Sequence, residues 1–354
     1  MEKETFTIVI PCLNEKDTIQ QVVKDSFQAL KRYGSENSEI IIADNGSTDG
    51  SLKLLKKWRK LKVIHVPIRG YGATLHYGIL SSSTKYILFA DADLSYDLLE
   101  IYKFLPPIHK QYDLILGSRF LGTIENGAMP LLHKLIGTPF LTFLIKIIYK
   151  INTTDCNSGM RAIKKSFYQR LHMKDSGMEW ASELLIKTSI YHGKYIEVPI
   201  RFKKDKRKQK PHLKSWEDGW RHLKVIILLK PKILIIFAIA IIGIGIFSLS
   251  YSFFTAIAMI LFAEFWVLSY LTLEALRAAI HREPNRISNF INNIPLVLAS
   301  SLLTIVGIAQ LFLISDRHLF TKYIILFQVV IVDLWVFFIE TIKTHLINPL
   351  SNKL

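Results

Sequence analysis

The first 120 residues alternate short apolar runs with segments of helical periodicity, and this alternation limits the possible folds more than any other feature of the chain. Apolar runs that predict strands lie at 6–10, 39–43, 62–66, 86–90 and 113–117. Helical periodicity covers residues 17–33, 48–61 and 72–82. Strands that alternate with helices form a mostly parallel sheet with right-handed crossovers. We therefore expect an α/β domain with a Rossmann-like sheet.

Polar clusters follow the predicted strands, where a parallel sheet binds its ligands. They are Asn14-Glu15, the segment 44–49, the segment 69–72, Asp91-Ala92-Asp93 and the segment 117–119. Asp91 and Asp93 come directly after the apolar run 86–90, which predicts a buried strand. Two carboxylates in this position suit a hard divalent cation that carries a diphosphate. The sequence therefore predicts a site for Mg²⁺ or Mn²⁺ with a phosphorylated ligand.

The charge of the chain favours a polyanionic partner. Formal net charge is +16, although 50% of the residues are hydrophobic. No helix-turn-helix, zinc-finger or RNP pattern occurs, which disfavours nucleic acid. Anionic lipid and phosphorylated substrates are therefore the expected partners. Cys12 and Cys156 form no metal or redox motif, so we expect both to be reduced.

The last third of the chain contains four apolar stretches of membrane-spanning length. They lie at about 233–251, 253–273, 294–314 and 323–342, within a predicted membrane domain at 231–345. Two hairpins return both termini to one side, and the arginine-containing middle loop predicts that this side is cytoplasmic. We expect a multi-pass plasma (inner) membrane protein whose N-terminal domain, residues 1–230, is cytoplasmic. Glu264 and Asp333 lie inside predicted spans and are functional candidates by default.

The segment 129–150 is apolar but also contains His133, Lys134, Lys146 and Lys150. Gly137 and Pro139 interrupt it, which predicts two helices rather than one span. We expect amphipathic helices that lie in the membrane interface. A helix pair within the core of the soluble domain is the alternative.

The order of the motifs resembles family 2 glycosyltransferases with a GT-A fold, especially polyprenyl-phosphate hexose synthases of the dolichol-phosphate mannose synthase type. The resemblance covers roughly residues 5–225. The motifs that carry it are V-I-P-C-L-N-E (9–15), D-N-G-S-T-D-G (44–50), R-G-Y-G-A (69–73), D-A-D-L (91–94), G-S-R (117–119) and S-G-M-R-A (158–162). It implies a GT-A domain followed by an all-α membrane domain of four helices.

The resemblance also implies roles in donor binding. Asp93 would bind the metal, Asp91 would lie near the ribose and the metal, and Asp44 would contact the nucleobase or ribose. The remaining expected contacts to the nucleotide sugar are Pro11, Asn14, Glu15, Asn45, Gly70, Gly72 and Ala92. Gly70 and Gly72 would permit close approach of the backbone to the nucleotide. The donor would be a GDP- or UDP-sugar.

The acceptor determines which side chains the reaction needs. A hydroxyl acceptor needs a general base, whereas a lipid phosphate is already anionic, because its second pKa is about 6. A phosphate needs cations instead, and Arg119 matches the first phosphate-binding arginine of the family. His133 and Lys134 stand where many members have a second arginine. The basic run 201–214 offers Arg207, with Arg201 as the second choice.

Three functions remain open from the sequence. We expect metal-dependent, inverting transfer of one sugar to a polyprenyl phosphate, with Asp91, Asp93 and Arg119 as catalytic residues. The first alternative is transfer to a lipid hydroxyl of the diacylglycerol or ceramide type, with Glu179 as the nearest candidate base. Glu179 could equally cap a helix. The second alternative is a non-catalytic membrane scaffold or lipid-transport protein.

Overall fold

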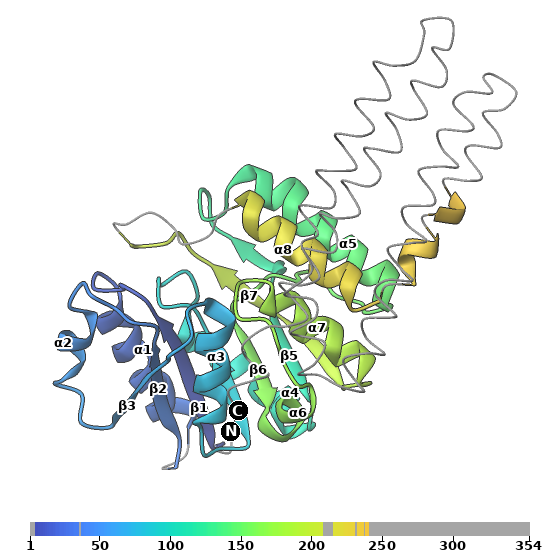
Figure 1. Ribbon diagram of the computed structural model, residues 1–354. Helices are drawn as coiled ribbons and strands as arrows, with labels where there is room; N and C mark the ends of the chain where they lie inside the picture. The colour runs from blue at the N-terminus through green and yellow to red at the C-terminus, as the bar shows by residue number, and fades with distance from the viewer. Residues whose placement is uncertain (1–3, 35–36, 208–214, 231, 237, 241–354) are drawn as a thin grey trace, which may run out of the picture. The chain divides into compact units, whose positions relative to one another are not determined.

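The computed structural model describes residues 4–34, 37–207, 215–230, 232–236 and 238–240. Within them a seven-stranded sheet has the order β3-β2-β1-β4-β6-β5-β7 (Figure 1). Its strands are β1 (Phe6–Cys12), β2 (Glu39–Asp44), β3 (Leu61–His65), β4 (Tyr86–Phe89), β5 (Leu114–Ile124), β6 (Arg161–Lys164) and β7 (Tyr195–Phe202).

The sheet is mostly parallel, as the alternation of strands and helices predicts. Strands β3, β2, β1 and β4 run parallel to one another, and β5 is parallel to β7. Strand β6 is antiparallel to both of its neighbours, β4 and β5. The sequence does not reveal β6 as a strand, because four residues are too few for a periodic pattern.

The described helical elements connect the strands and cover the sheet. They are α1 (Ile19–Tyr33), α2 (Ser51–Leu55), α3 (Tyr71–Leu80), η1 (Leu98–Lys103), α4 (Leu105–His109), η2 (His133–Gly137), α5 (Thr138–Tyr149), α6 (Lys165–Arg170), α7 (Trp180–Ile190) and α8 (Ser215–Leu228). Helix α2 is much shorter than the predicted 48–61, because the chain must already be extended at Leu61 to pair with Ile40.

The core explains why β1 carries a continuous apolar run. Ile8 and Ile10 belong to the core cluster that includes Val22 and Val23 of α1. Val9 points to the other face, where a Cβ added to Gly78 of α3 would lie 2.4 Å from its Cγ1. Both faces of the strand are therefore covered by helices, as in buried parallel sheets.

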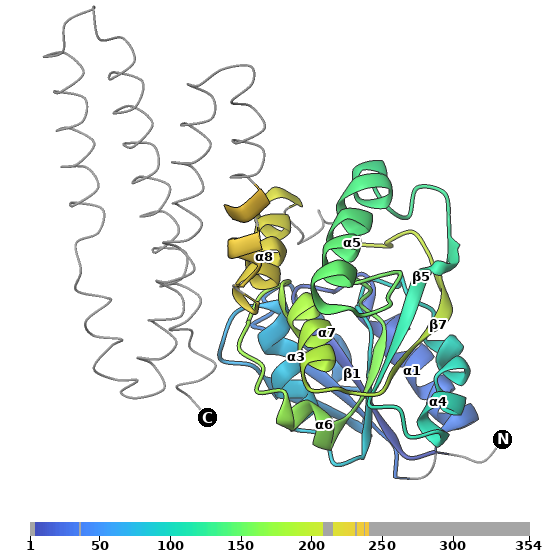
Figure 2. The same ribbon diagram turned by 90° about the vertical axis from the view of Figure 1, so that its right-hand side faces the viewer.

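The segment predicted as two interface helices is one helical run from Leu131 to Tyr149. A π-helical turn, η2, leads directly into α5, and Pro139 lies in the first turn of α5. The helical run continues through Gly137 and Pro139, because the π-helical turn directly before the proline changes the local hydrogen-bond pattern and so accommodates a residue without an N–H. Figure 2 shows α5 beside α7 and α8.

The chain divides into two compact units, and nearly all described residues belong to the first, which ends at Ile226. Among the described residues, no helix is long and apolar enough to cross a membrane. The four predicted spans lie outside the described residues, apart from the start of the first. Glu264 and Asp333 also lie outside the described residues.

Candidate active site

A cavity of about 720 Å³ opens at the carboxyl ends of the central strands. Of the residues predicted from the sequence, it is lined by Pro11, Glu15, Asn45, Gly70, Asp91, Ala92, Asp93, Arg119 and Arg207. The described residues therefore include one site that brings together the acidic pair and two of the predicted arginines. The strand-end positions of these residues explain the convergence, because parallel strands end at one edge of a sheet.

Asp91 and Asp93 follow β4 and are held by different partners. The hydroxyl of Tyr71 donates to Oδ1 of Asp91 at 2.8 Å. Oδ1 of Asp93 accepts from the backbone N–H of Ser95 at 2.9 Å and from its hydroxyl at 2.5 Å. Burial, and then the charge of Asp93, raise the pKa of Asp91. Bringing a cation to the pair would relieve that repulsion.

Gly159 makes room for the acidic pair. A Cβ at this position would lie 2.4 Å from Oδ2 of Asp91. The backbone N–H of Gly159 donates to the hydroxyl of Tyr96 at 2.7 Å, which fixes the loop before β6. The sequence places Gly159 in a family motif but gives no reason for it, since the contact depends on β6 lying beside β4.

Arg207 connects the acidic pair to the loop after β1. Its guanidinium lies 3.2 Å from Oδ2 of Asp93, 3.1 Å from Oε1 of Glu15 and 2.7 Å from Oδ2 of Asp205. Burial raises the pKa of Glu15 to about 7, although the charge of Arg207 partly offsets it. The sequence predicts Arg207 to bind an acceptor phosphate, and in this structure it is an internal counter-ion of the predicted metal carboxylates.

The acidic pair suits a metal ion that is completed by its ligand. No group of three or more His, Cys, Asp or Glu residues able to hold a metal occurs in the described part of the chain. Mg²⁺ is typically bound by one or two carboxylates together with substrate phosphates. Asp93 already faces a cation, the guanidinium of Arg207. The residues present therefore fit a divalent ion that arrives with a diphosphate.

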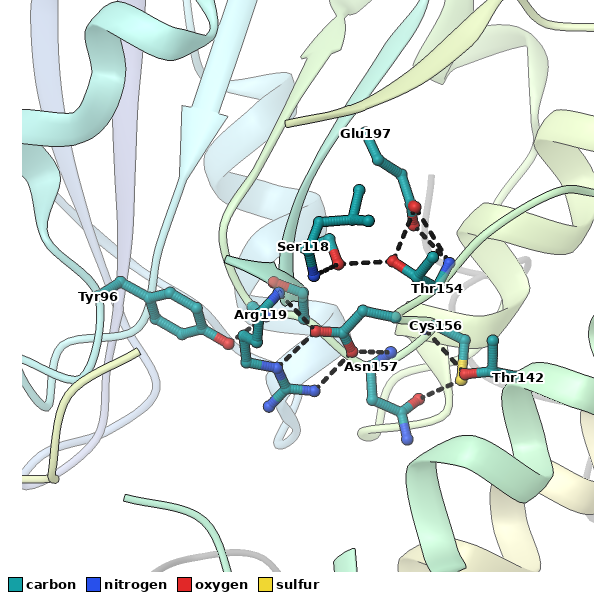
Figure 3. A network of polar contacts seen from close by, with 12 residues as sticks. Tyr96, Ser118, Arg119, Thr142, Thr154, Cys156, Asn157 and Glu197 are labelled. Atoms are coloured by element: carbon teal, nitrogen blue, oxygen red, sulfur yellow. Dashed lines mark hydrogen bonds and ion pairs between the residues drawn. The ribbon is translucent and has the colours of Figure 1, made fainter. Parts of the chain in front are cut away.

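Arg119 is fixed by a side chain that the sequence does not single out. Asp155 accepts from Nε of Arg119 at 2.7 Å, from Nη2 at 2.7 Å and from its backbone N–H at 3.0 Å (Figure 3). Arg119 is 8% exposed, and its guanidinium stacks on Phe202, 5.1 Å from the ring centre. This bidentate pair sets the orientation of the guanidinium, while Nη1 takes no part in it.

A second set of hydrogen bonds supports the segment that carries Asp155. Glu197 of β7 accepts from the backbone N–H and hydroxyl of Thr154, each at 2.8 Å. The hydroxyl of Thr154 lies 2.6 Å from that of Ser118, next to Arg119 (Figure 3). The loop before β6 is thereby tied to β5 and β7.

Asn45 and Arg69 shape the side of the cavity at β2 and β3. Asn45 donates to the carbonyl of Ile68 at 2.7 Å and accepts from the N–H of Gly70 at 2.9 Å. Arg69 donates to the carbonyl of Asn45 and lines the cavity. Arg69 and Tyr71 belong to the R-G-Y-G-A motif, but the sequence gives neither a role.

Two residues expected to contact the nucleotide form hydrogen bonds with the backbone of the loop after β2. Asp44 is 1% exposed and accepts from the backbone N–H groups of Gly46 and Ser47 at 3.0 and 3.1 Å. Asn14 accepts from the N–H of Thr48 at 2.8 Å. Neither residue is among those that line the cavity. Asp44 therefore takes part in a turn in this structure, and its contact with base or ribose stays a prediction.

Gly70 and Gly72 serve close packing within the protein. A Cβ on Gly70, whose φ is +133°, would lie 2.1 Å from the carbonyl oxygen of Ser176. A Cβ on Gly72 would lie 2.4 Å from Cβ of Trp180. Gly70 still lines the cavity, whereas Gly72 does not. The sequence attributes both to the approach of the nucleotide, because it does not reveal that the segment before α7 packs here.

Four further predicted site residues lie outside the cavity lining. His133 is close enough to Arg119 for that charge, after burial, to lower the pKa of His133. Lys134 belongs to the π turn, and Arg201 is exposed on β7. Glu179 is 4% exposed at the start of α7 and makes no capping hydrogen bond with its side chain.

Helix α8 adds residues that the sequence treats only as a lead into the first predicted span. Glu217, Asp218, Arg221 and His222 all line the cavity. The spacing of Asp218 and His222 is a weak sequence signal for one helix face. This spacing could have revealed a polar helix face, although the sequence does not show what that face contacts.

Comparisons with known proteins define the family. The family model described as Glycosyl transferase family 2 matches residues 7–171. The low-salt glycan biosynthesis hexosyltransferase Agl6 of Haloferax volcanii is 31% identical over 255 residues, which cover 70% of this chain and 60% of that protein. Protein MJ1222 of Methanocaldococcus jannaschii is 30% identical over 209 residues, 57% of this chain and 82% of that protein. The chain belongs to glycosyltransferase family 2, which confirms the family that its motifs resemble.

Solved structures similar to this chain include glucosyl-3-phosphoglycerate synthase from Mycobacterium tuberculosis. It is 20% identical, with a TM-score of 0.49, over 63% of this chain and 79% of that one. One structure of that enzyme contains Mn²⁺, UDP and glucosyl-3-phosphoglycerate, and another contains Mg²⁺ and UDP. The mostly parallel sheet with one antiparallel strand matches the GT-A fold expected for the family.

Proposed function

We propose that this glycosyltransferase moves a single sugar from a nucleoside-diphosphate sugar to a polyprenyl phosphate, with inversion and with Mg²⁺ or Mn²⁺. One observation carries the proposal: the cavity lined by Asp91 and Asp93 is also lined by Arg119 and Arg207, two of the four arginines in its wall. An acidic pair suits the metal diphosphate of the donor, and a buried Arg119 with a half-buried Arg207 suits a second, anionic substrate.

The donor would lie across the sheet edge. Arg69 and Asn45 line the side at β2 and β3, which is suited to the nucleoside, and Asp91 and Asp93 lie at the end of β4. A metal bound by these carboxylates would stabilise the negative charge that develops on the departing diphosphate. The metal-bound neighbours support this cofactor, since glucosyl-3-phosphoglycerate synthase was solved with UDP and either ion.

The acceptor phosphate would be held by Arg119. Asp155 fixes the guanidinium, so its orientation is set before a substrate binds. Arg207 would supply a second contact once it is released from Asp93. A phosphate oxygen that is already anionic can attack the anomeric carbon without a general base, and a single in-line displacement inverts the configuration.

A membrane setting fits the apolar face of α5 and the turn before it. The large exposed side chains there are Leu131, Leu132, Leu135, Ile136, Phe140, Phe143 and Ile147. Such a face is suited to the headgroup boundary of a bilayer, where a polyprenyl phosphate presents its phosphate. We propose that this face contacts the membrane from the cytoplasmic side, with the spans predicted at 231–345 as anchor.

A donor and acceptor panel tests the function. The full-length chain in detergent is incubated with Mn²⁺, one of GDP-mannose, UDP-glucose, UDP-galactose or UDP-N-acetylglucosamine, and undecaprenyl phosphate or diacylglycerol. We expect transfer of one sugar from one donor class to the lipid phosphate, in a product that mild acid cleaves. Transfer to diacylglycerol alone would overturn the acceptor, and failure to bind any nucleotide sugar would support a non-catalytic role.

A further inference from the structure

Helix α8 presents a polar face to the cavity that contains Asp91 and Asp93. Asp218 and His222 lie one turn apart on this face and are 6% and 5% exposed. Trp216 belongs to the opposite side of the helix and is 86% exposed. The buried polar pair therefore belongs to the cavity wall, and the proposed mechanism gives it no role.

His222 has one ring nitrogen engaged and one available. Its Nδ1 lies 2.8 Å from the hydroxyl of Ser182 on α7. No hydrogen bond to Nε2 is present among the described residues, although the side chain is almost fully buried. Burial is the main reason that the pKa of His222 falls to about 4, so the ring is neutral at neutral pH. A buried neutral imidazole in a cavity wall needs a hydrogen-bonding partner, which a ligand can supply.

The position of α8 identifies the part of the donor that it faces. Arg161 of β6 donates to the carbonyl of Ala181 in α7 at 2.8 Å, and Tyr149 of α5 donates to the carbonyl of Ile226 in α8 at 2.5 Å. Helix α8 thus contacts α5 directly and is linked to β6 through α7, where His222 meets Ser182. With the nucleoside on the β1–β3 side and the diphosphate at β4, as proposed above, the sugar would extend toward α8.

We propose that His222 and Asp218 bind hydroxyl groups of the transferred sugar and thereby select the donor. This inference rests on the proposed function and deepens it. A carboxylate accepts hydrogen bonds from hydroxyls but repels a phosphate, so Asp218 favours the neutral sugar over the acceptor head group. Asp218 also pairs with Arg221, 3.5 Å away, so the discrimination comes mainly from His222, whose Nε2 a wrong substrate would leave without a hydrogen bond.

Binding to the nucleotide alone is compared with binding to the whole donor. The full-length chain in detergent is titrated by calorimetry with Mn²⁺ and UDP or GDP, and then with UDP-glucose, UDP-N-acetylglucosamine or GDP-mannose. For His222→Ala and Asp218→Asn we expect unchanged affinity for the nucleoside diphosphate. Affinity for the sugar nucleotide should fall about tenfold, as for one lost hydrogen bond in a cavity. His222→Gln should restore part of the loss.

Trp216→Ala is the matched control from the exposed side of α8, and both of its affinities should equal those of the wild type. The unchanged nucleoside-diphosphate affinity also shows that each variant is folded. Parallel losses of both affinities, or no loss at all, would overturn the sugar contact while leaving the proposed function intact. A wild-type chain that binds neither UDP nor GDP would overturn the proposed function and this inference together.

Discussion

The ion pairs of Arg207 compete with a metal ion for the carboxylate of Asp93. The guanidinium contacts Asp93, Glu15 and Asp205, which come from three separate loops. Breaking a buried charged contact is costly unless a new partner replaces it. A divalent ion is such a partner for Asp93, and an acceptor phosphate is such a partner for Arg207. Metal binding and acceptor binding are therefore expected to favour each other.

Asp93→Asn should abolish sugar transfer while the protein remains folded. The amide keeps the shape of the side chain and can still accept from Ser95, but it loses the charge that holds a hard cation. Turnover is measured with the donor and acceptor found in the panel, and folding by thermal unfolding in detergent. Wild-type activity in this variant would contradict the assignment of Asp93 to the metal.

Arg207→Ala should increase the affinity for Mn²⁺ by about tenfold, the equivalent of about 1.4 kcal/mol. The substitution removes the internal cation that competes for Asp93. Free Mn²⁺ is measured by electron paramagnetic resonance without nucleotide, so the result does not depend on turnover. Sugar transfer should nevertheless fall, because the second phosphate contact is lost.

Lys203→Ala is the control for Arg207→Ala. Lys203 lies in the same loop, and its ammonium pairs with Asp97 at 2.7 Å, away from Asp93. Its removal should leave the Mn²⁺ affinity unchanged. An affinity that stays constant or decreases in Arg207→Ala would contradict competition between the guanidinium and the metal.

At the level of single elements, α5 and the π turn before it carry the largest group of exposed apolar side chains in the described part of the chain. Ile136, Phe140, Phe143 and Ile147 are spaced by three or four residues, so they lie on one face. Ile145 of the same helix is buried. The helix thus has one face in the protein and one apolar face without a described partner, which favours contact with a bilayer.

Replacing Phe143 and Ile147 with Asp should raise the KM for a long-chain polyprenyl phosphate at least about tenfold. Two carboxylates on this face oppose contact with an anionic bilayer, at about 1 kcal/mol or more for each charge. The KM for the donor should not change. Lys57→Glu, at an exposed position of the domain, is the charge-matched control. Activity of the full-length chain is measured in vesicles. Equal KM values for the polyprenyl phosphate in all variants would show that α5 has no role in acceptor binding.

At the scale of the whole molecule, stability depends on groups that the fold buries. His222 is the clearest case, because its pKa is lowered from 6.5 to about 4. The unfolded chain then binds more protons than the folded chain between these values. The contribution of His222 to stability is therefore complete above pH 6.5 and is lost as the pH drops toward 4.

His222→Gln should remove the contribution of this side chain to the pH dependence of stability, because glutamine does not titrate. The wild type should lose stability on acidification more steeply than the variant, by up to about 1.4 kcal/mol for each pH unit between 6.5 and 4. Thermal unfolding in detergent at several pH values measures the difference. Parallel pH profiles for the two proteins would show that His222 titrates normally in the fold.

Strand and helix positions in the first 90 residues follow from the sequence, because they depend on local periodicity. Strand β1 and helices α1 and α3 lie within a few residues of their predicted bounds. The one-piece run through η2 and α5, the short α2 and the antiparallel β6 do not follow from it. Each depends on a partner distant in sequence, as Leu61 depends on Ile40.

The candidate site divides in the same way. The predicted strand ends already indicate that Asp91, Asp93, Glu15 and Arg119 come together, because the carboxyl ends of parallel strands share one edge of a sheet. The pairing of Asp155 with Arg119, the pairing of Arg207 with Asp93 and the place of His222 in the cavity wall are visible only in the folded chain. These contacts join segments that are 36 to more than 100 residues apart, and side-chain packing, which no local pattern encodes, brings them together.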